Sequence, residues 1–313
     1  MAREVPVSDW LVRKAALEGV RWRRWLDELG DLIEWIERAW DLRVGAVIDG
    51  GTASLIAEAD TADGTPAVLK LAMPAEGDGW DALEREVPVL RLVDGRGCAR
   101  VLRYDGSHGA ALLERLGRQL ADLELPITRQ MEVICSTLQR LWAVPERDDL
   151  PSGAEKGRFL ADAIARTWEA LDHPCSERVA AKAIEFANRR ADAFDIERAV
   201  LVHGDAHAWN TLEAGPAEPN GFKFVDPDGL IAEPEYDLAI PMREYGDELL
   251  AGDAGALGRE RARFLAHLTG LDVEKVWEWG FVERVSTGLF VIELGHVEPG
   301  QLFLDVAEAW ALV

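Results

Sequence analysis

The chain has 313 residues, of which 57 are acidic and 34 are basic, so its formal net charge is −23 with histidine neutral. Nucleic-acid binding depends on basic groups that neutralise phosphates, and the same charge opposes binding to an anionic membrane, so both classes are excluded. The excess acid favours cationic partners such as metals, polyamines or basic small molecules, although solubility is its simpler explanation.

Cysteine usage and the N-terminal segment predict a soluble, cytoplasmic protein. Cys98, Cys135 and Cys175 are scattered and form no CxxC motif, which argues against a disulfide framework or a zinc site. Residues 1–19 lack the apolar run of a signal peptide, and no apolar stretch is long enough to span a bilayer.

The N-terminal third reads as a helix followed by strands. Apolar residues within 22–40 recur at helical spacing, which predicts an amphipathic helix with a tryptophan-rich buried face. From about residue 43, short apolar runs break at Gly50–Gly51 and at Asp63–Gly64, which predicts strands joined by tight turns, the second a hairpin. A helix near 80–93 and strands in VLRYDG and ALLERL complete this part.

Beyond Pro126 the apolar spacing is mostly helical, and Ser176 and Asp272 stand where two of the helices need an N-cap. Between these helices, AVLV (199–202) and FKFV (222–225) predict two short strands around a Pro/Gly-rich turn. We therefore expect an α+β protein whose small strand-rich domain, 1–113, precedes a larger helical domain, 114–313.

The stretch HGDAHAWN, 203–210, carries the strongest chemical signal. Asp205 precedes Asn210 by five positions, and Asp226 follows in FVDPDG after the next strand, which is the arrangement of a phosphotransferase catalytic loop. One carboxylate accepts the hydrogen bond of the attacking hydroxyl, and an amide oxygen and a second carboxylate are hard ligands for Mg²⁺. HGD alone is common by chance, and an Asp in a turn often caps backbone amides, so the ordered set carries the interpretation.

The N-terminal part offers groups for a nucleotide. Lys70 ends the strand AVLK, where a lysine neutralises α- and β-phosphates in kinases, although a strand-end lysine that reaches solvent looks the same. The turn from Gly50 to Ser54 is suited to bind phosphate through its backbone amides or the Ser54 hydroxyl. Ordinary hairpin turns also often contain Gly-Gly, so the turn alone does not indicate a nucleotide. Glu86 on the following helix is suited to pair with Lys70, and Glu84 competes for that role.

Several motifs together resemble a known family. VHGDAHAWN, FVDPDG and EYDLA resemble the aminoglycoside phosphotransferase family, and GGTAS, AVLKL, VDGRGCARVL, LLERL and DPDGLIAEPEYDLAIPMRE are similar to its streptomycin 6-kinase/hydroxyurea-kinase branch. The resemblance covers about residues 25–290. It implies a bilobal protein-kinase-like fold and ATP-dependent O-phosphorylation with Mg²⁺.

The resemblance also implies roles for individual residues. Asp205 is the catalytic base or hydroxyl-orienting group, Asn210 and Asp226 bind Mg²⁺, Lys70 binds the α/β-phosphates and Glu86 orients that lysine. Backbone groups of a hinge at Glu114 and Leu116 contact adenine, and Asp237 in EYDLA braces the catalytic loop. Two features depart from the family pattern: Leu116-Gly117-Arg118 replaces the usual Pro-Gly after the hinge, and Trp209 replaces a glycine before Asn210.

Substrate identity has no spacing rule. The acids that follow the metal motif are either contacts for substrate amines or guanidines or solvated loop charge: Asp228, Glu233, Glu235 and Glu244. His203 and His207 flank Asp205 and shape the loop; no third His or Cys nearby supports a metal role for them.

We therefore expect a kinase that phosphorylates a hydroxyl of a small cationic natural product, such as a streptomycin-like aminoglycoside antibiotic, and thereby confers resistance. A metabolic kinase of choline, homoserine or a sugar and a non-catalytic pseudokinase remain the alternatives. A protein kinase fits less well, because HGD replaces HRD and no APE-like segment follows Asp226. The sequence does not indicate an oligomeric state.

Overall fold

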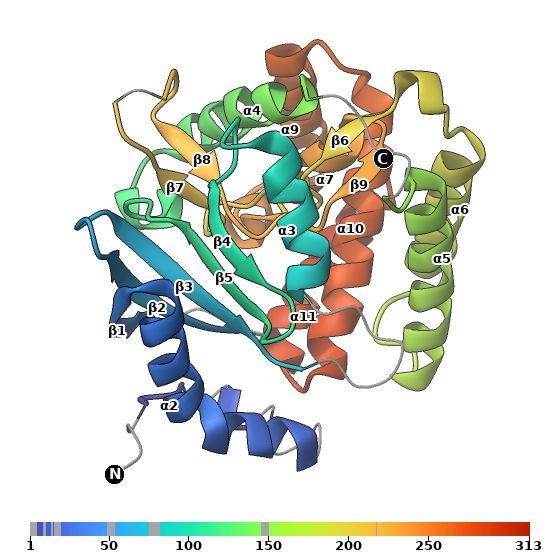
Figure 1. Cartoon of the computed structure of the whole chain (residues 1–313). Helices are drawn as coiled ribbons and strands as arrows, with labels where there is room; N and C mark the ends of the chain where they lie inside the picture. The colour runs from blue at the N-terminus through green and yellow to red at the C-terminus, as the bar shows by residue number, and fades with distance from the viewer. Residues whose placement is uncertain are drawn as a thin grey trace. The chain divides into compact units, whose positions relative to one another are not determined.

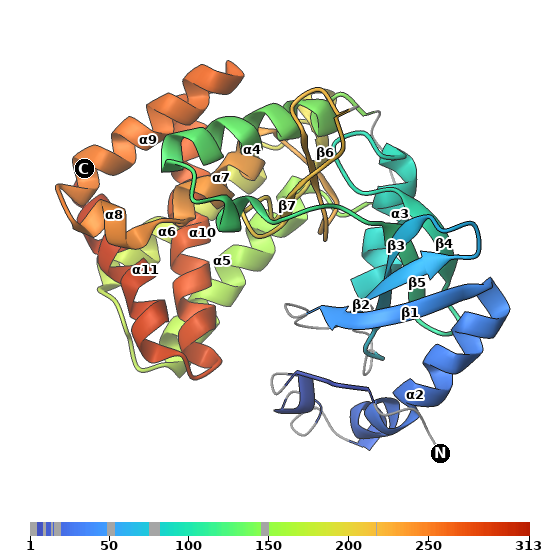
Figure 2. The same cartoon turned by 90° about the vertical axis from the view of Figure 1, so that its left-hand side faces the viewer.

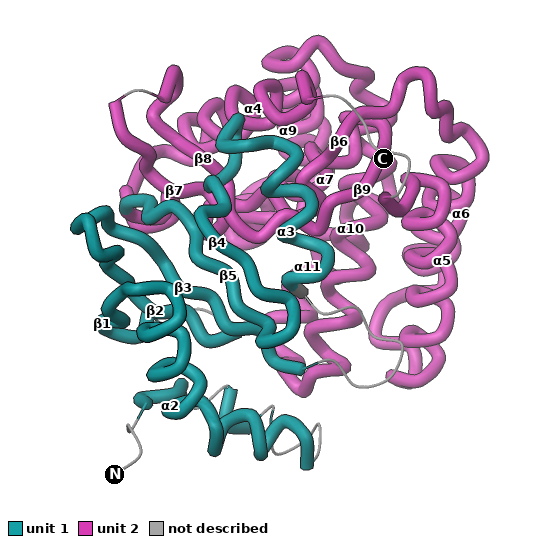
Figure 3. The backbone as a smooth tube through the Cα atoms, in the orientation of Figure 1, with its two compact units in different colours: residues 1–117 teal, residues 118–313 magenta. Residues whose placement is uncertain are grey.

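The computed structural model describes residues 5–8, 11–13, 15, 20–48, 54–74, 82–144, 150–216 and 218–313. The chain divides into two compact units, residues 1–117 and 118–313 (Figure 3). The segment 114–117, expected in the second domain, falls in the first unit.

The N-terminal unit is built around one antiparallel sheet with the strand order β1-β2-β3-β5-β4 (Figure 1). Its elements are α2 (Val20–Trp40), β1 (Leu42–Ile48), β2 (Ser54–Thr61), β3 (Pro66–Ala72), α3 (Ala82–Val93), β4 (Val101–Asp105) and β5 (Ala110–Glu114).

Helix α2 packs beside β1 (Figure 2) and confirms the amphipathic helix expected over 22–40. Its face of Trp22, Trp25, Leu29 and Ile33 lies in one core with the inner side chains of the first three strands, because residues three and four apart share a side of a helix. The expected hairpin is also present. Gly64 has φ +81° between β2 and β3, a backbone conformation that favours glycine. The turn expected at Gly50–Gly51 lies outside the described residues.

The C-terminal unit is mainly helical. Its helices are the 3₁₀ segment η1 (Leu120–Leu123), α4 (Ile127–Trp142), α5 (Gly153–Ala170), α6 (Glu177–Asp192), the 3₁₀ segment η2 (Ile196–Arg198), α7 (Glu235–Arg243), α8 (Gly246–Leu250), α9 (Ala254–Thr269), α10 (Val273–Glu293) and α11 (Val297–Trp310). Its strands are β6 (Val200–Val202), β7 (Thr211–Glu213), β8 (Phe222–Phe224) and β9 (Leu230–Ala232).

Helix α10 is the centre of this unit, since it contacts α5, α6, α7, α9 and α11 (Figure 2). Buried side chains occur all around it, including Trp277, Trp279 and Phe281, as expected of a helix enclosed by others. Asp272 caps its N-terminus by accepting hydrogen bonds from the backbone N–H groups of Glu274 and Lys275, as expected.

One expectation for this unit needs correction. The short strands at 200–202 and 222–224 do not pair with each other: β6 pairs with β9, and β8 pairs with β7. Three-residue strands have too little side-chain alternation to specify a partner, so the return path of the chain decides the pairing. Ser176 does occupy the N-cap of α6, but its hydroxyl bonds the Glu308 carboxylate instead of the helix backbone.

Among the described residues, no helix combines the length and apolarity needed to cross a membrane.

Candidate active site

Asp237 ties the loop after β6 to helix α7. Its Oδ1 accepts a hydrogen bond from Gly204 N–H at 2.8 Å, and its Oδ2 accepts bonds from His203 N–H at 3.0 Å and Trp142 Nε1 at 2.8 Å. The carboxyl is fully buried, and burial raises its pKa to about 6 although these three donors favour the ionised form. One side chain therefore satisfies two successive loop amides and fixes where the loop begins.

Gly204 is required by space and by backbone conformation. Its φ is +86°, and a Cβ built on it would lie 2.8 Å from the Cβ of Asp228 and 3.2 Å from Leu230. The backbone N–H of Asp228 bonds the carbonyl of His203 at 2.9 Å. The two motifs HGD and DPDG therefore touch along their backbones, which only a residue without a side chain permits.

His203 is a neutral, fully buried imidazole. Its Nδ1 accepts the backbone N–H of Asp205 at 3.1 Å, and Nε2 bonds the Val225 carbonyl at 3.0 Å, so the proton lies on Nε2. Burial lowers its pKa to about 4, although the nearby Asp205 charge opposes this shift. His203 thus links Asp205 to the segment that carries Asp226.

Asp205 is held on both carboxylate oxygens. Oδ1 accepts a hydrogen bond from Arg243 Nη2 at 2.6 Å, and Oδ2 lies 3.2 Å from His207 Nε2 and 3.4 Å from Asn210 Nδ2. Burial alone would raise the pKa of Asp205, but the His207 hydrogen bond and the Arg243 charge lower it below its usual range. The group is therefore an ionised acceptor, and about a third of the side chain remains exposed.

Arg243, at the end of α7, was not identified from the sequence. Its guanidinium also bonds Glu283 Oε2 on α10 and Glu244 Oε1, each at 3.2 Å, and Glu283 accepts a further bond from the buried Tyr236 hydroxyl at 2.7 Å. The only local signal was a basic residue four positions after the EYDLA motif. Two of its partners, Asp205 and Glu283, lie 38 and 40 positions away along the chain, so no spacing rule indicates them.

Asn210 and Asp226 are brought close by the backbone. Val225 N–H bonds the Asn210 carbonyl at 3.0 Å, so the residue before Asp226 is joined directly to the residue expected to share its metal ion. The Asn210 amide nitrogen bonds the Asp205 carbonyl at 3.1 Å, which turns the amide oxygen to the other side. Asp226 has φ +58°, and this left-handed residue redirects the chain just after β8.

In the N-terminal unit, Lys70 on β3 and Glu86 on α3 form a buried ion pair. Lys70 Nζ lies 2.6 Å from Glu86 Oε2, and both side chains are less than one-tenth exposed. Glu84, the competing residue, is exposed. Helical spacing explains the choice, because Glu86 lies on the side of α3 that also buries Leu83 and Leu90.

Other residues expected to contact the nucleotide also lie in this unit. Ser54 is buried at the start of β2, next to residues outside the description. Glu114 ends β5, and its N–H donates to the Arg100 carbonyl at 2.8 Å. Leu116 follows in a segment without regular secondary structure before Arg118.

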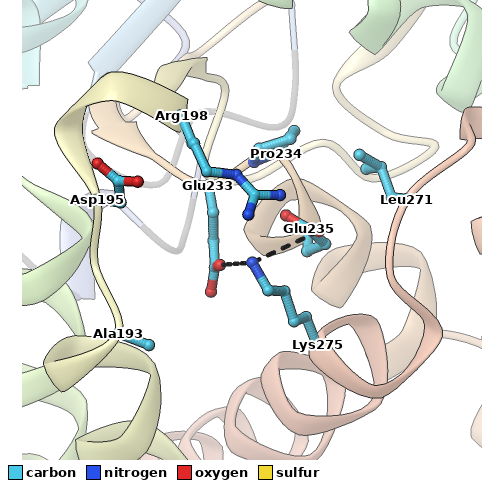
Figure 4. A pocket seen from close by; sticks show the side chains of 8 residues that line it. All are labelled: Ala193, Asp195, Arg198, Glu233, Pro234, Glu235, Leu271 and Lys275. Atoms are coloured by element: carbon cyan, nitrogen blue, oxygen red, sulfur yellow. Dashed lines mark hydrogen bonds and ion pairs between the residues drawn. The ribbon is translucent and has the colours of Figure 1, made fainter.

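The structure separates the acidic residues expected to contact substrate. Glu233 and Glu235 line a pocket of about 170 Å³ with Asp195, Arg198 and Lys275, and both carboxylates point toward the Lys275 ammonium (Figure 4). Their partners belong to the helical core and not to the Asp205 loop. Glu244, by contrast, bonds Arg243, and Asp228 is an exposed residue whose backbone bonds the loop at His203.

Within the part of the chain that the structure describes, histidine and cysteine form no metal site. Among the described residues, no group of three or more His, Cys, Asp or Glu side chains is arranged to hold a metal ion. His207 instead uses Nε2 on Asp205 and accepts the Asn210 N–H on Nδ1 at 3.2 Å.

The fold is that of small-molecule kinases. An ethanolamine kinase from Plasmodium vivax matches with a TM-score of 0.58 over 98% of this chain and 96% of that one, at 15% identity. An aminoglycoside phosphotransferase from Streptomyces rimosus matches with a TM-score of 0.56 over 83% of this chain and 98% of that one, at 19% identity. The kinase-like α+β fold expected from the sequence is thereby confirmed.

Sequence comparison then gives the family. Residues 39–295 match the family described as aminoglycoside/hydroxyurea antibiotic resistance kinase, and the chain belongs to this family. A hydroxyurea phosphotransferase from Kitasatospora aureofaciens is 32% identical over 89% of this chain and 77% of its own length. A streptomycin 6-kinase from Streptomyces glaucescens is 28% identical over 97% of this chain and 95% of its own length.

Proposed function

We propose that this chain is a cytoplasmic, ATP-dependent O-phosphotransferase that phosphorylates a hydroxyl of a small cationic natural product, with a streptomycin-like aminoglycoside as the leading substrate class. The observation that carries the proposal is the Asp205 carboxylate, which is ionised, partly exposed and braced by His207, Asn210 and Arg243. Such a group accepts the hydrogen bond of a hydroxyl and aims its oxygen at a phosphorus atom.

The chain's donor set fits Mg²⁺. Asn210 presents an amide oxygen turned away from Asp205, and Asp226 presents a carboxylate on the adjoining backbone. Mg²⁺ prefers hard oxygen ligands and takes only one or two from the protein, the rest being water and phosphate. When bound, the ion would neutralise charge on the β- and γ-phosphates. Asn210 and Asp226 would hold it, and His207 would keep Asn210 in place by accepting the Asn210 backbone N–H.

Lys70 would neutralise the α- and β-phosphates, and Glu86 would keep its ammonium in position and charged. The 2.6 Å buried pair supports this assignment, because an isolated buried lysine tends to lose its proton. Backbone groups at Glu114 and Leu116 would contact the adenine, and Ser54 a phosphate. Asp237 would brace the catalytic loop through its bonds to two loop amides.

The acceptor has a second candidate. The relative with the higher identity is named hydroxyurea phosphotransferase, so a small hydroxyl compound without a sugar is also supported. Both candidates are tested by ADP release with Mg-ATP and a panel of streptomycin, other aminoglycosides, hydroxyurea, choline, homoserine and sugars. We expect acceptor-dependent ADP release with streptomycin; release with a metabolic alcohol alone, or with no acceptor at all, contradicts the proposal.

The nucleotide assignment has its own experiment. Lys70→Met should lower kcat/KM for ATP by about 100-fold, through a higher KM and a lower kcat, because it removes the cation from the phosphates. Glu84→Gln is the matched control, since this exposed glutamate lies on the same helix as Glu86 without forming the pair. Equal activity in Lys70→Met and the wild type would contradict the role of the lysine.

A further inference from the structure

We propose that Arg243 is a positioning residue for phosphoryl transfer: it fixes the Asp205 carboxylate so that a single acceptor direction, on Oδ1, remains for the substrate hydroxyl. This inference rests on the proposed function of Asp205. It assigns the reaction a residue outside both the HGD loop and the DPDG segment.

A count of acceptor directions supports the inference. An ionised carboxylate offers about four lone-pair directions, two on each oxygen. Arg243 takes one on Oδ1, and His207 and Asn210 take the two on Oδ2. The direction left on Oδ1 lies beside the guanidinium, so a hydroxyl bound there is oriented by Arg243 acting through Asp205.

The arginine is held firmly enough to do this. Glu283 on α10 and Glu244 each bind its guanidinium at 3.2 Å, and Tyr236 holds Glu283 from behind. Arg243 itself is only 13% exposed, whereas Asp205 is 34% exposed, so the open side of the pair belongs to the carboxylate. A planar guanidinium can bind all three carboxylates at once, which a lysine ammonium in the same place does less well.

The transfer step follows from this arrangement. The acceptor oxygen forms its bond to the γ-phosphorus while the bond from that phosphorus to the bridging oxygen of ADP breaks, and ADP leaves with the bonding electrons. The hydroxyl proton passes to Asp205 Oδ1 and then to solvent.

A purely structural role for Arg243 would consist of tying α7 to the loop. Asp237, however, already makes that connection through the N–H groups of His203 and Gly204. Loss of Arg243 therefore leaves the loop attached while Asp205 loses its orientation. This difference makes the two roles separable by experiment.

The test compares Arg243→Gln, Arg243→Lys and a matched control, Arg190→Gln. Arg190 is a similarly buried arginine between two glutamates, Glu233 and Glu278, with no contact to Asp205. We expect Arg243→Gln to lower kcat by about 100-fold and Arg243→Lys by about 10-fold, with each KM changed less than about threefold. Arg190→Gln should lose thermal stability and keep its kcat.

Two further measurements separate orientation from folding. In the Asp205→Asn background, Arg243→Gln should cause almost no additional loss, since a residue that acts through Asp205 has nothing left to position. Guanidinium ion at sub-denaturing concentration should restore part of the kcat of Arg243→Ala.

The possible failures are distinguishable. Wild-type kcat in Arg243→Gln, or the same 100-fold loss in the Asp205→Asn background, overturns the positioning role while the proposed function stands. A wild-type protein without any acceptor-dependent ADP release overturns the proposed function and this inference together.

Discussion

Asp205 and Glu233 are both acidic side chains bound to an arginine in the C-terminal unit, yet they differ in what they leave open to a ligand. Glu233 accepts bonds from Trp279 Nε1 at 2.8 Å and Lys275 Nζ at 2.7 Å, and Arg190 lies 3.4 Å away. Its side chain is 11% exposed, against 34% for Asp205. The Glu233 carboxylate is therefore enclosed by its partners, whereas the Asp205 carboxylate, although held on both oxygens, stays partly exposed.

This difference shows that the net negative charge of the chain does not by itself locate a binding site for a cation. The acidic residues that follow the metal motif in sequence divide between the helical core and the catalytic loop, so proximity along the chain does not identify a substrate contact. What distinguishes Asp205 is partial exposure combined with donors that leave an acceptor direction unused. Charge alone carries neither property.

The largest expected effect is on Asp205. Asp205→Asn keeps the shape and removes the proton acceptor, so kcat should fall at least about 1,000-fold. Thermal stability should change little, because Arg243 retains Glu283 and Glu244. ADP release and a thermal melt measure the two quantities. An active Asp205→Asn enzyme would remove the basis of the comparison.

Glu233→Gln should have the opposite profile. It leaves Arg190 and Lys275 without a shared carboxylate in a buried setting, which should lower the free energy of unfolding by about 3 kcal/mol. The kcat should stay within about twofold of the wild type. Urea denaturation and ADP release decide the outcome; a large rise in KM for a cationic acceptor would instead make Glu233 a substrate contact.

His203 predicts how stability depends on pH. Its pKa is about 4 in the folded protein and 6.5 when unfolded, so the unfolded chain binds the extra proton first as pH falls. The contribution of neutral His203 to the free energy of unfolding is complete above pH 6.5 and is lost as pH falls toward 4. The loss between pH 7 and pH 5 amounts to about 2 kcal/mol. In His203→Gln the midpoint of urea unfolding should change less over this interval; an equal change in both proteins would contradict the assignment.

The smallest effect is expected at Glu244. This carboxylate is 29% exposed and makes one 3.2 Å bond to Arg243, which keeps Asp205 and Glu283 without it. Glu244→Gln should therefore lower kcat by no more than about threefold. Steady-state kinetics with a cationic and a neutral acceptor provides the control. A rise in KM confined to the cationic acceptor would make Glu244 a substrate contact.

Much of the fold was predictable because long amphipathic segments carry their own signal. Helix α2 and the Asp272 cap followed from periodicity and local hydrogen-bonding chemistry. The pairing of β6 with β9 did not, since three residues carry almost no register information. The resemblance to the family indicated the kinase-like arrangement more strongly than any single element did.

The candidate site was predictable only as far as its residues follow one another at fixed spacing. Asp205, Asn210 and Asp226 were predicted this way, and their roles stay predictions. The structure distinguishes Glu86 from Glu84 by the side of α3 on which each lies. The partners Arg243 and Glu283 come from different helices, so only the folded chain reveals them. The enclosure of Glu233 by Lys275 and Arg190 is likewise a property of tertiary packing.

The catalytic loop also contains an optical reporter. Trp209, directly before Asn210, is 55% exposed, more than any other tryptophan in the described part of the chain, and most of the others are buried or half-buried. A water-exposed indole emits at longer wavelength than an enclosed one, so among the tryptophans that the structure describes, Trp209 should contribute most to the red edge of the fluorescence. Subtracting the spectrum of Trp209→Phe isolates that component, and ligand arrival at the loop can be followed without a label.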